Sequence, residues 1–259
     1  MVTVYDEKTI GDIRTAADIV TAVLLELVAL TKPDVNLDML DELAERMIRE
    51  RGGEPYNKGY KPEWAATAYP ATICAAVNEE VCHATPRGRV LKEGDIVTYD
   101  LGVRYQSGCG DAAITVAVGE ISNRKEKTMR YCKRALYAGI KKVKAGVAIR
   151  DVSDAIGGSA LIHGYNVIQG LGGHTIGKEM HEEPHVPNWP DPQQEDVLFE
   201  GQVICLEPMI SPGKGRVGIA AIDGWTVFTL DSQPCAMYEH MILVTKDGYE
   251  ILTKHFDEN

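Results

Sequence analysis

The sequence lacks the features that would place the protein in a membrane or on a nucleic acid. Its longest mostly apolar run, "IVTAVLLELVAL" at 19–30, is interrupted by Glu26 and is too short to span a bilayer. No run of five basic residues occurs, and the formal net charge of −11 disfavours partners that reward Lys and Arg patches. We therefore expect neither a membrane nor a nucleic acid as the main partner.

The sequence also lacks the cysteine patterns of a secreted or zinc-finger protein. Six cysteines are scattered without a C-x-x-C pair, so neither a disulfide framework nor a structural zinc site is indicated. The first ten residues, "MVTVYDEKTI", have neither the basic start nor the apolar run of a secretory signal. These absences predict a cytoplasmic protein in which most thiols are reduced and buried.

What the sequence does contain is enough apolar residues for a large core, 44% of 259. We expect one domain, 1–259, with halves at roughly 1–120 and 121–259. Apolar residues at steps of three and four predict four helices. The first helix contains 13–27 and ends before Pro33, and the second contains 37–48 and ends at Gly52 and Gly53. The third carries the apolar residues from Met129 to Val143. The fourth begins at Ile149 and is weakened by Gly157 and Gly158.

Strand-like alternation follows each pair of predicted helices. The stretches "DIVTYDLGV" and "DAAITVAVG" flank the turn-like "RYQSGCG" and predict a β-hairpin. From about residue 199, "GQVICLEPMI", "GWTVFTL" and "MYEHMILVT" predict further short strands. The repeated order of helices and strands predicts the α+β class and hints at an internal duplication. Residues 54–71, rich in Pro, Gly and aromatics, predict an ordered loop that is either a lid over a site or a plain connector.

Two aspartates on the hairpin avoid its apolar face. If the turn centres on Gln106 and Ser107, Asp111 faces Gly102 and lies diagonally from Asp100, about 7–8 Å away between backbones. Carboxylates that converge raise each other's pKa unless a cation lies between them. A metal pair ~3.5–4 Å apart would remove this repulsion. The alternative is two acids that face solvent.

Histidines and further acids cluster in the second half. The stretch "GGHTIGKEMHEEPHV" at 172–186 contains three of the seven histidines, and glycines there permit close backbone approach. A single histidine of this kind is more often structural. However, Glu207 and Glu239 lie inside apolar strand-like runs, where an ionised carboxylate is costly without a partner. Alternation places Glu207 on the same face as Cys205 and Val203.

Seven motifs together resemble the type I methionine aminopeptidases: "NEEVCH" (78–83), "GDIVTYDLGV" (94–103), "GDAAITVAVG" (110–119), "GGHTIGKEMHEEP" (172–184), "CLEPMI" (205–210), "DGWTVFTLD" (223–231) and "YEHMILVT" (238–245). The resemblance covers nearly the whole chain in order and spacing. It implies the α+β pita-bread fold, in which two pseudo-symmetric halves with antiparallel sheet and flanking helices surround a dinuclear metal site.

The resemblance also implies a set of site residues. Two divalent ions (Co, Mn, Fe or Zn) would be held by Asp100, Asp111, His174, Glu207 and Glu239. Asp100 and Asp111 would hold one ion, and Asp111, His174, Glu207 and Glu239 would hold the second, with Asp111 and Glu239 bridging. Glu207 would also accept a proton, and His83 and His181 would contact the substrate amide. His185 has no implied role, and we expect it to be structural.

The implied pocket for the methionine side chain departs from the family in places. Its walls would be Tyr60, Tyr69, Cys74, Met180 and Trp225, with Met180 where many relatives have Phe. Asn57 falls where a pocket cysteine is often found, and residues within "KPEWAATA" lengthen the loop before Tyr69. Thr175 replaces a glycine of the family's "GHGIG" and adds bulk beside His174.

Three functions compete on these grounds. The first is a monomeric, cytoplasmic aminopeptidase that removes methionine from peptides or nascent proteins. The second is a related metalloaminopeptidase, or a prolidase-like enzyme, with another N-terminal specificity. The third is a non-catalytic binding module of the same fold, which the presence of all five implied ligands disfavours.

Overall fold

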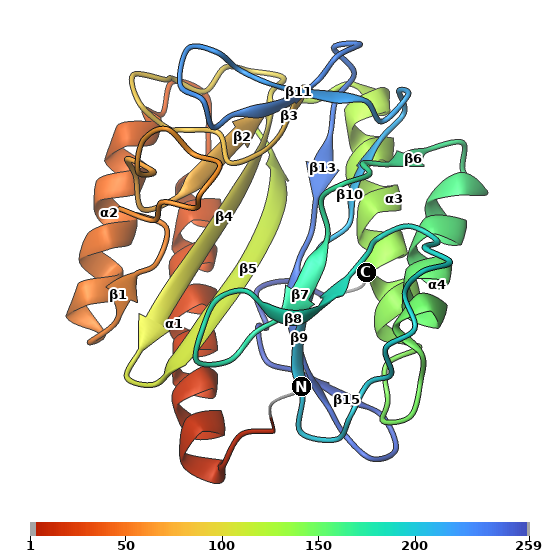
Figure 1. Ribbon diagram of the computed structural model, residues 1–259. Coiled ribbons are helices and arrows are strands. Elements are labelled where there is room, and N and C mark those ends of the chain that lie inside the picture. The colour runs from red at the N-terminus through yellow and green to blue at the C-terminus, as the bar shows by residue number, and fades with distance from the viewer. Residues whose placement is uncertain (1–3, 258–259) are drawn as a thin grey trace.

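The strands of the protein lie between two pairs of helices in a computed structural model that describes residues 4–257 (Figure 1). Helices α1 (Glu7–Leu30) and α2 (Leu37–Glu50) cover one side, and α3 (Asn123–Ile140) and α4 (Ile149–Leu161) cover the other. The ends of the predicted 1–259 domain, 1–3 and 258–259, lie outside the described residues. The element order confirms the α+β class.

Helices α1 and α2 form where the apolar spacing predicts them. The Asp6 side chain caps α1 by accepting a hydrogen bond from the Thr9 N–H at 2.8 Å. The Asn36 side chain caps α2 by accepting from the Asp38 N–H at 2.8 Å. The predicted stripe of α1, from Ile13 to Leu27, is buried against the hairpin of β4 (Ile96–Tyr105) and β5 (Gly108–Ala117). Burial of this stripe fixes α1 behind the hairpin.

The β4–β5 hairpin has the predicted register. Its turn lies at 106–107, and Asp111 pairs with Gly102, so Asp111 is diagonal to Asp100. Close approach of α1 requires a glycine, because a Cβ on Gly110 would lie 2.6 Å from the carbonyl carbon of Ala16. The hairpin therefore holds both aspartates on one strand pair supported by a helix.

The second helix pair follows the prediction with two corrections. The stripe from Met129 lies in α3, whereas Val143 lies beyond the last residue of that helix. Helix α4 continues through Gly157 and Gly158, where the sequence predicted a weak point. Burial of its apolar side against α3 and the core outweighs the low helix propensity of glycine.

Within the described residues the strands form four antiparallel sheets. Strand β4 pairs with β5 and also with β1 (Glu54–Pro55) and β2 (Cys74–Val77). A five-stranded sheet runs in the order β15 (Tyr249–Ile251), β14 (His240–Val244), β9 (Val203–Leu206), β7 (Gly173–Thr175) and β8 (Glu182–Val186). One three-stranded sheet has the order β13 (Ala236–Met237), β10 (Met209–Ser211) and β6 (Asn166–Val167). The other has the order β11 (Val217–Ile219), β12 (Val227–Thr229) and β3 (Glu80–Cys82).

A β-bridge joins the hairpin to the segment that leads into the five-stranded sheet. A bridge pairs Ile114 of β5 with Tyr238, two residues before β14. The next residue, Glu239, donates its N–H to the carbonyl of Ala113 at 2.9 Å. This connection brings the acids of the hairpin beside the ligands predicted in the second half.

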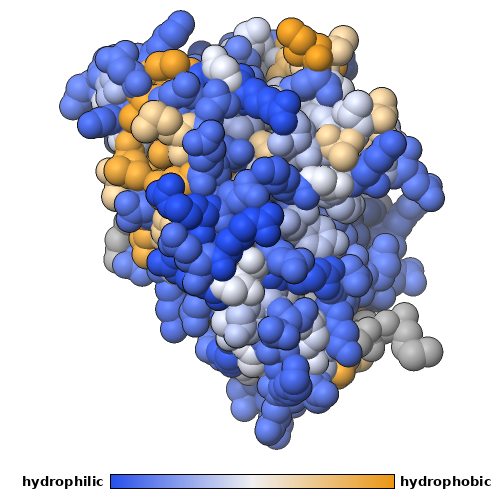
Figure 2. Space-filling model, turned by 90° about the vertical axis from the view of Figure 1, so that its left-hand side faces the viewer, coloured by the Kyte–Doolittle hydropathy of each residue, from blue (hydrophilic) through white to orange (hydrophobic). Residues whose placement is uncertain are grey.

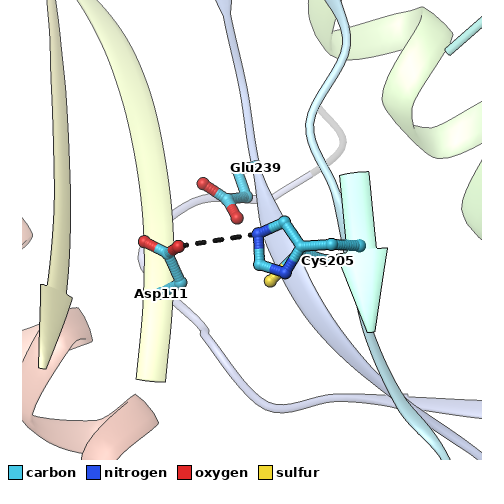
Figure 3. Close-up of side chains that lie close together, drawn as sticks. Asp111, Cys205 and Glu239 are labelled. Carbon is cyan, nitrogen blue, oxygen red and sulfur yellow. Dashed lines mark ion pairs between the residues drawn. The ribbon is translucent and has the colours of Figure 1, made fainter. Parts of the chain in front are cut away.

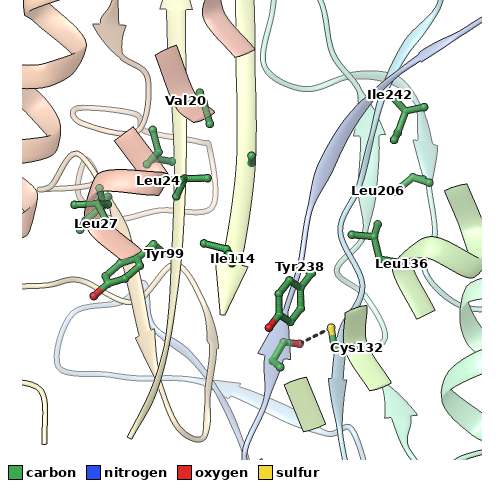
Figure 4. Packing of buried hydrophobic residues seen from close by; sticks show 14 of the residues in the cluster. Val20, Leu24, Leu27, Tyr99, Ile114, Cys132, Leu136, Leu206, Tyr238 and Ile242 are labelled. Atoms are coloured by element: carbon green, nitrogen blue, oxygen red, sulfur yellow. Dashed lines mark hydrogen bonds between the residues drawn. The ribbon is translucent and has the colours of Figure 1, made fainter. Parts of the chain in front are cut away.

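The largest core cluster extends from α1 through the strands to α3 and α4 (Figure 4). Leu24 and Tyr99 belong to its first part, and Leu136 and Leu206 to its second. The face on the α2 side is mostly hydrophilic, with apolar residues gathered along one edge (Figure 2). All six cysteines are buried free thiols, as predicted. In residues 4–257 no helix combines the length and apolarity needed to cross a bilayer.

Candidate active site

The five predicted ligands meet where β5 faces the five-stranded sheet. Asp100 lies on β4, Asp111 on β5 and His174 on β7, while Glu207 directly follows β9 and Glu239 directly precedes β14. The last four side chains belong to the buried polar residues of the chain, and Glu239 is only 1% exposed. Five residues from separate parts of the sequence thus lie together, four of them buried and Asp100 half-buried.

Two carboxylates of this group, Asp111 and Glu239, lie close together beside Cys205 (Figure 3). His174 Nε2 lies 3.6 Å from Oε1 of Glu207 and 3.9 Å from Oδ2 of Asp111. Ligand atoms of Asp111, His174, Cys205 and Glu239 all lie within 4.8 Å of one another. Donors of these types at such separations can share one cation.

Two oxygens in the group lack partners. Oδ1 of Asp111 and Oε1 of Glu239 are buried and accept no hydrogen bond from the described residues. The other ring nitrogen of His174, Nδ1, lies 3.1 Å from the Thr175 carbonyl. An Nδ1–H that donates to this carbonyl leaves the Nε2 lone pair directed at the acids. The donor set therefore fits a cation.

The electrostatics of the group also favour a bound cation. Burial raises the pKa of Asp100 to about 7. Burial, and then the charges of Glu239 and Asp100, raise the pKa of Asp111 well above its usual range. Burial and neighbouring acids do the same to Glu207 and Glu239. Burial lowers the pKa of His174 to about 3, so its ring is neutral near pH 7. A bound cation would relieve the repulsion among these carboxylates.

A cavity of about 310 Å³ opens beside the acids. All five predicted pocket residues line it, together with both aspartates and the two histidines predicted to contact substrate. Its lining residues are Tyr56, Asn57, Tyr60, Trp64, Tyr69, Cys74, His83, Asp100, Asp111, Met180, His181 and Trp225. The cavity is therefore polar at the acids and mainly aromatic or apolar elsewhere.

The lengthened loop forms part of this aromatic wall. Its base is closed by two backbone hydrogen bonds, from Gly59 N–H to the Tyr69 carbonyl and from Tyr69 N–H to the Tyr60 carbonyl. Trp64, at 57% exposure, has its ring centroid 5.0 Å from that of the buried Trp225 in an edge-on arrangement. Of the predicted 54–71 loop, only β1 is a strand. The loop thus packs against the site rather than serving as a plain connector.

The two predicted substrate histidines both line the cavity. His83 has φ 53°, and burial lowers its pKa to about 4. His181 is exposed, and its ring centroid lies 4.5 Å from that of His174. His185 pairs with His174 in the β7–β8 ladder but is itself exposed. The structure therefore brings His83 and His181, and not His185, to the cavity lining.

Thr175, the departure beside His174, is fully buried within strand β7. Its hydroxyl donates to the Pro184 carbonyl at 3.1 Å and accepts from Gln202 Nε2 at 2.9 Å. These bonds satisfy the hydroxyl and tie β7 to two neighbouring segments. The extra bulk is accommodated in a strand that carries the histidine.

Three residues at the site were not predicted as part of it: Tyr56, Trp64 and Cys205. Trp64 lies in the inserted loop, for which the motifs gave no register. Its aromatic character within a Pro-rich and Gly-rich segment was the available signal. Cys205 shares a strand face with Glu207, and this alternation was a signal that it points toward the acids.

Comparison with known proteins agrees with this geometry. Residues 11–246 match metallopeptidase family M24. Methionine aminopeptidase 1 of Bacillus subtilis is 36% identical over 95% of this chain and 97% of its own length. The methionine aminopeptidase of Aquifex aeolicus is 38% identical over 96% of this chain and 98% of its own length. The resemblance drawn from the motifs is therefore confirmed over nearly the whole chain.

Solved structures give the same result. The crystal structure of methionine aminopeptidase from Rickettsia prowazekii has a TM-score of 0.92 and 32% identity, covering 98% of this chain and all of that one. Prolidase from Pyrococcus furiosus, at 18% identity and a TM-score of 0.73, shares the fold, and the match covers 66% of its length. The predicted pita-bread fold is confirmed, and the chain belongs to metallopeptidase family M24.

Proposed function

We propose that the protein is a metal-dependent aminopeptidase that removes methionine from the N-terminus of peptides or nascent proteins. The observation that carries the proposal is the position of the buried acids and His174 at the polar side of an otherwise aromatic cavity. A scissile amide held there would meet hydrolytic groups while an apolar side chain occupied the wall. The methionine aminopeptidases that match the chain along its length support this assignment.

The residues that would hold the metal are among those that converge at the site. Asp100 and Asp111 would hold one divalent ion, and Asp111, His174, Glu207 and Glu239 a second. The unpartnered oxygens of Asp111 and Glu239 support the assignment of both residues as metal ligands. When bound, divalent ions polarise a carbonyl and make a bound water acidic near neutral pH. Co, Mn, Fe and Zn all suit a set of carboxylates with one imidazole.

The protein side chains have separate tasks in the hydrolysis. Glu207 accepts a proton from the attacking water and returns it to the leaving amine. His83 and His181 donate N–H groups to the substrate amide and to the oxygen on which charge develops. Trp225, Met180 and the neighbouring walls bind the thioether side chain, since sulfur packs favourably on aromatic rings.

We propose that the chain acts as a monomer, because one chain supplies every residue of the site. A cytoplasmic location is consistent with its buried free thiols. A peptide or nascent-protein N-terminus is the proposed partner.

A second candidate is an aminopeptidase of this fold with another N-terminal specificity. Met180, Asn57 and Trp64 favour it, because all three line the cavity at points where this chain departs from the family pattern. A binding module without activity is disfavoured, because the complete ligand set converges.

The deciding experiment uses peptides X-Ala-Ser with the first residue varied. The protein is stripped with a chelator and resupplied separately with Mn, Fe, Co or Zn, and the released amino acid is identified by mass spectrometry. Metal-dependent release restricted to methionine is the expected result. Release of a different residue would establish the second candidate, and bound metal without turnover at any peptide would establish the binding module.

A further inference from the structure

Cys205 is a buried thiol that the proposed function does not use. It lies on β9, is 0% exposed, and its sulfur is within 4.8 Å of ligand atoms of Asp111, His174 and Glu239 (Figure 3). The buried Cys132 sulfur, by contrast, lies 3.0 Å from the Pro208 carbonyl, and the Cys74 thiol contacts Asp100 but lies outside the converging group. Cys205 instead contacts the Glu239 carboxylate. The Cys205 thiol is therefore surrounded by the side chains of proposed metal ligands.

The strand arrangement fixes the sulfur in this position. Cys205 and Glu207 point to the same side by alternation, although Glu207 lies just beyond the strand. Strand β7 lies unusually close to β9, because a Cβ on Gly173 would be 2.0 Å from the Cys205 carbonyl oxygen. The next residue along β7 is His174, so close packing of the two strands brings imidazole and thiol together.

The strand on the other side of β9, β14, supplies a second sulfur atom. Met241 of β14 pairs with Cys205 across the sheet. Its Sδ lies 3.1 Å from the backbone nitrogen of Asp111 and accepts that N–H. Sulfur atoms on adjacent strands thus flank the acids on the side of the five-stranded sheet. The carboxylate oxygens left without partners belong to Asp111 and Glu239, two of the three residues whose ligand atoms lie within 4.8 Å of the thiol.

We propose that the sulfur of Cys205 is a sixth protein donor at this centre, to the ion held by Asp111, His174 and Glu239. The inference rests on the metal centre of the proposed function. When the sulfur–metal bond forms, the S–H bond breaks and its proton leaves to solvent. A thiolate among carboxylates makes the donor set softer, so the site favours Zn, Co and Fe over Mn more than oxygen and nitrogen donors alone would.

Cobalt absorption tests the bond directly. The metal-free full-length protein is titrated with Co²⁺ and its spectrum recorded. A sulfur–cobalt bond adds an intense near-ultraviolet charge-transfer band to the weak visible bands that any bound Co²⁺ gives. The variants are Cys205→Ser, which keeps a hydrogen-bond donor to Glu239, and Cys205→Ala. The matched control is Cys74→Ser, which removes the other thiol beside the acids, on the cavity wall near Asp100.

The expected result is a near-ultraviolet band in the wild-type protein and in Cys74→Ser that is lost in both Cys205 variants. The ratio of Zn to Mn affinity should also fall by about tenfold in Cys205→Ser. Visible cobalt bands without the charge-transfer band in the wild-type protein would overturn the inference and leave the proposed function standing. A band lost in Cys74→Ser instead would also overturn it. Absence of any Co²⁺ binding would overturn the proposed function itself, and the inference with it.

Discussion

The acids and the aromatic wall of the cavity are positioned by different parts of the molecule. Asp100, Asp111 and His174 lie on paired strands, and Glu207 and Glu239 are one residue from a strand. The aromatic wall comes largely from connecting segments, including the 60–69 loop and the turn before Trp225. Strand pairing fixes the chemistry, whereas loops set what the chemistry acts on. Changes in the two parts should therefore have separable effects.

Asp111→Asn should give the largest effect, since it removes charge and one donor oxygen from the centre of the strand-borne group. We expect loss of metal uptake and a fall in turnover on the order of 10³-fold or more. Metal content by mass spectrometry and peptide hydrolysis measure both. Asp247→Asn, at an exposed acid, is the control and should match the wild type. Normal turnover in Asp111→Asn would contradict the metal centre.

His181→Ala separates substrate contact from metal binding within the site. Because His181 lies at the cavity and outside the converging donors, metal content should be unchanged. The turnover number should fall by about 10²-fold, through loss of a donor to the developing charge. His185→Ala, which alters the exposed neighbour, should behave like the wild type. Equal loss of metal and turnover in His181→Ala would show that this histidine is a ligand.

Trp64→Ala tests the loop side of the comparison. Loss of the indole exposes Trp225, so KM for a methionine peptide should rise by about tenfold with little change in turnover number or metal content. Trp64→Phe retains an aromatic ring and should recover most of the loss. A wild-type KM in Trp64→Ala would show that the inserted loop does not contribute to binding.

His255→Gln should have the smallest effect on the site, because His255 only supports a strand that carries site residues. His255 Nε2 lies 3.2 Å from the Ala113 carbonyl, and burial lowers its pKa to about 4. The unfolded chain protonates this group near pH 6.5, so its contribution to stability is lost as pH falls from about 6.5 toward 4. The difference in unfolding free energy between wild type and variant should shrink by about 1.4 kcal/mol per pH unit in that window. A constant difference in denaturant unfolding would refute this account.

The same division decides what the sequence could predict. Alternation and a two-residue turn predicted that Asp111 pairs with Gly102, and the structure has that register. The buried acids Glu207 and Glu239 were recognisable because ionised groups rarely lie in apolar runs without partners. Their meeting with the hairpin depends on the Ile114–Tyr238 bridge, which no local pattern encodes.

Predictions for connecting segments were less complete for a physical reason. A loop has no fixed period, so the packing of Trp64 on Trp225 could not be read from spacing. Helix α4 shows the limit of local propensity, because tertiary burial carried it through Gly157 and Gly158. The roles of the ligands and of the two substrate histidines remain predictions, supported by where the side chains lie.

The partnerless oxygens of Asp111 and Glu239 also bear on how long the protein survives. Because the folded chain binds the cation and the unfolded chain lacks the assembled site, each tenfold rise of free metal above the dissociation constant adds about 1.4 kcal/mol to the folding equilibrium. In a cell short of metal, a larger fraction of chains would unfold and be degraded. The abundance of this protein, and not only its activity, would then follow the metal supply.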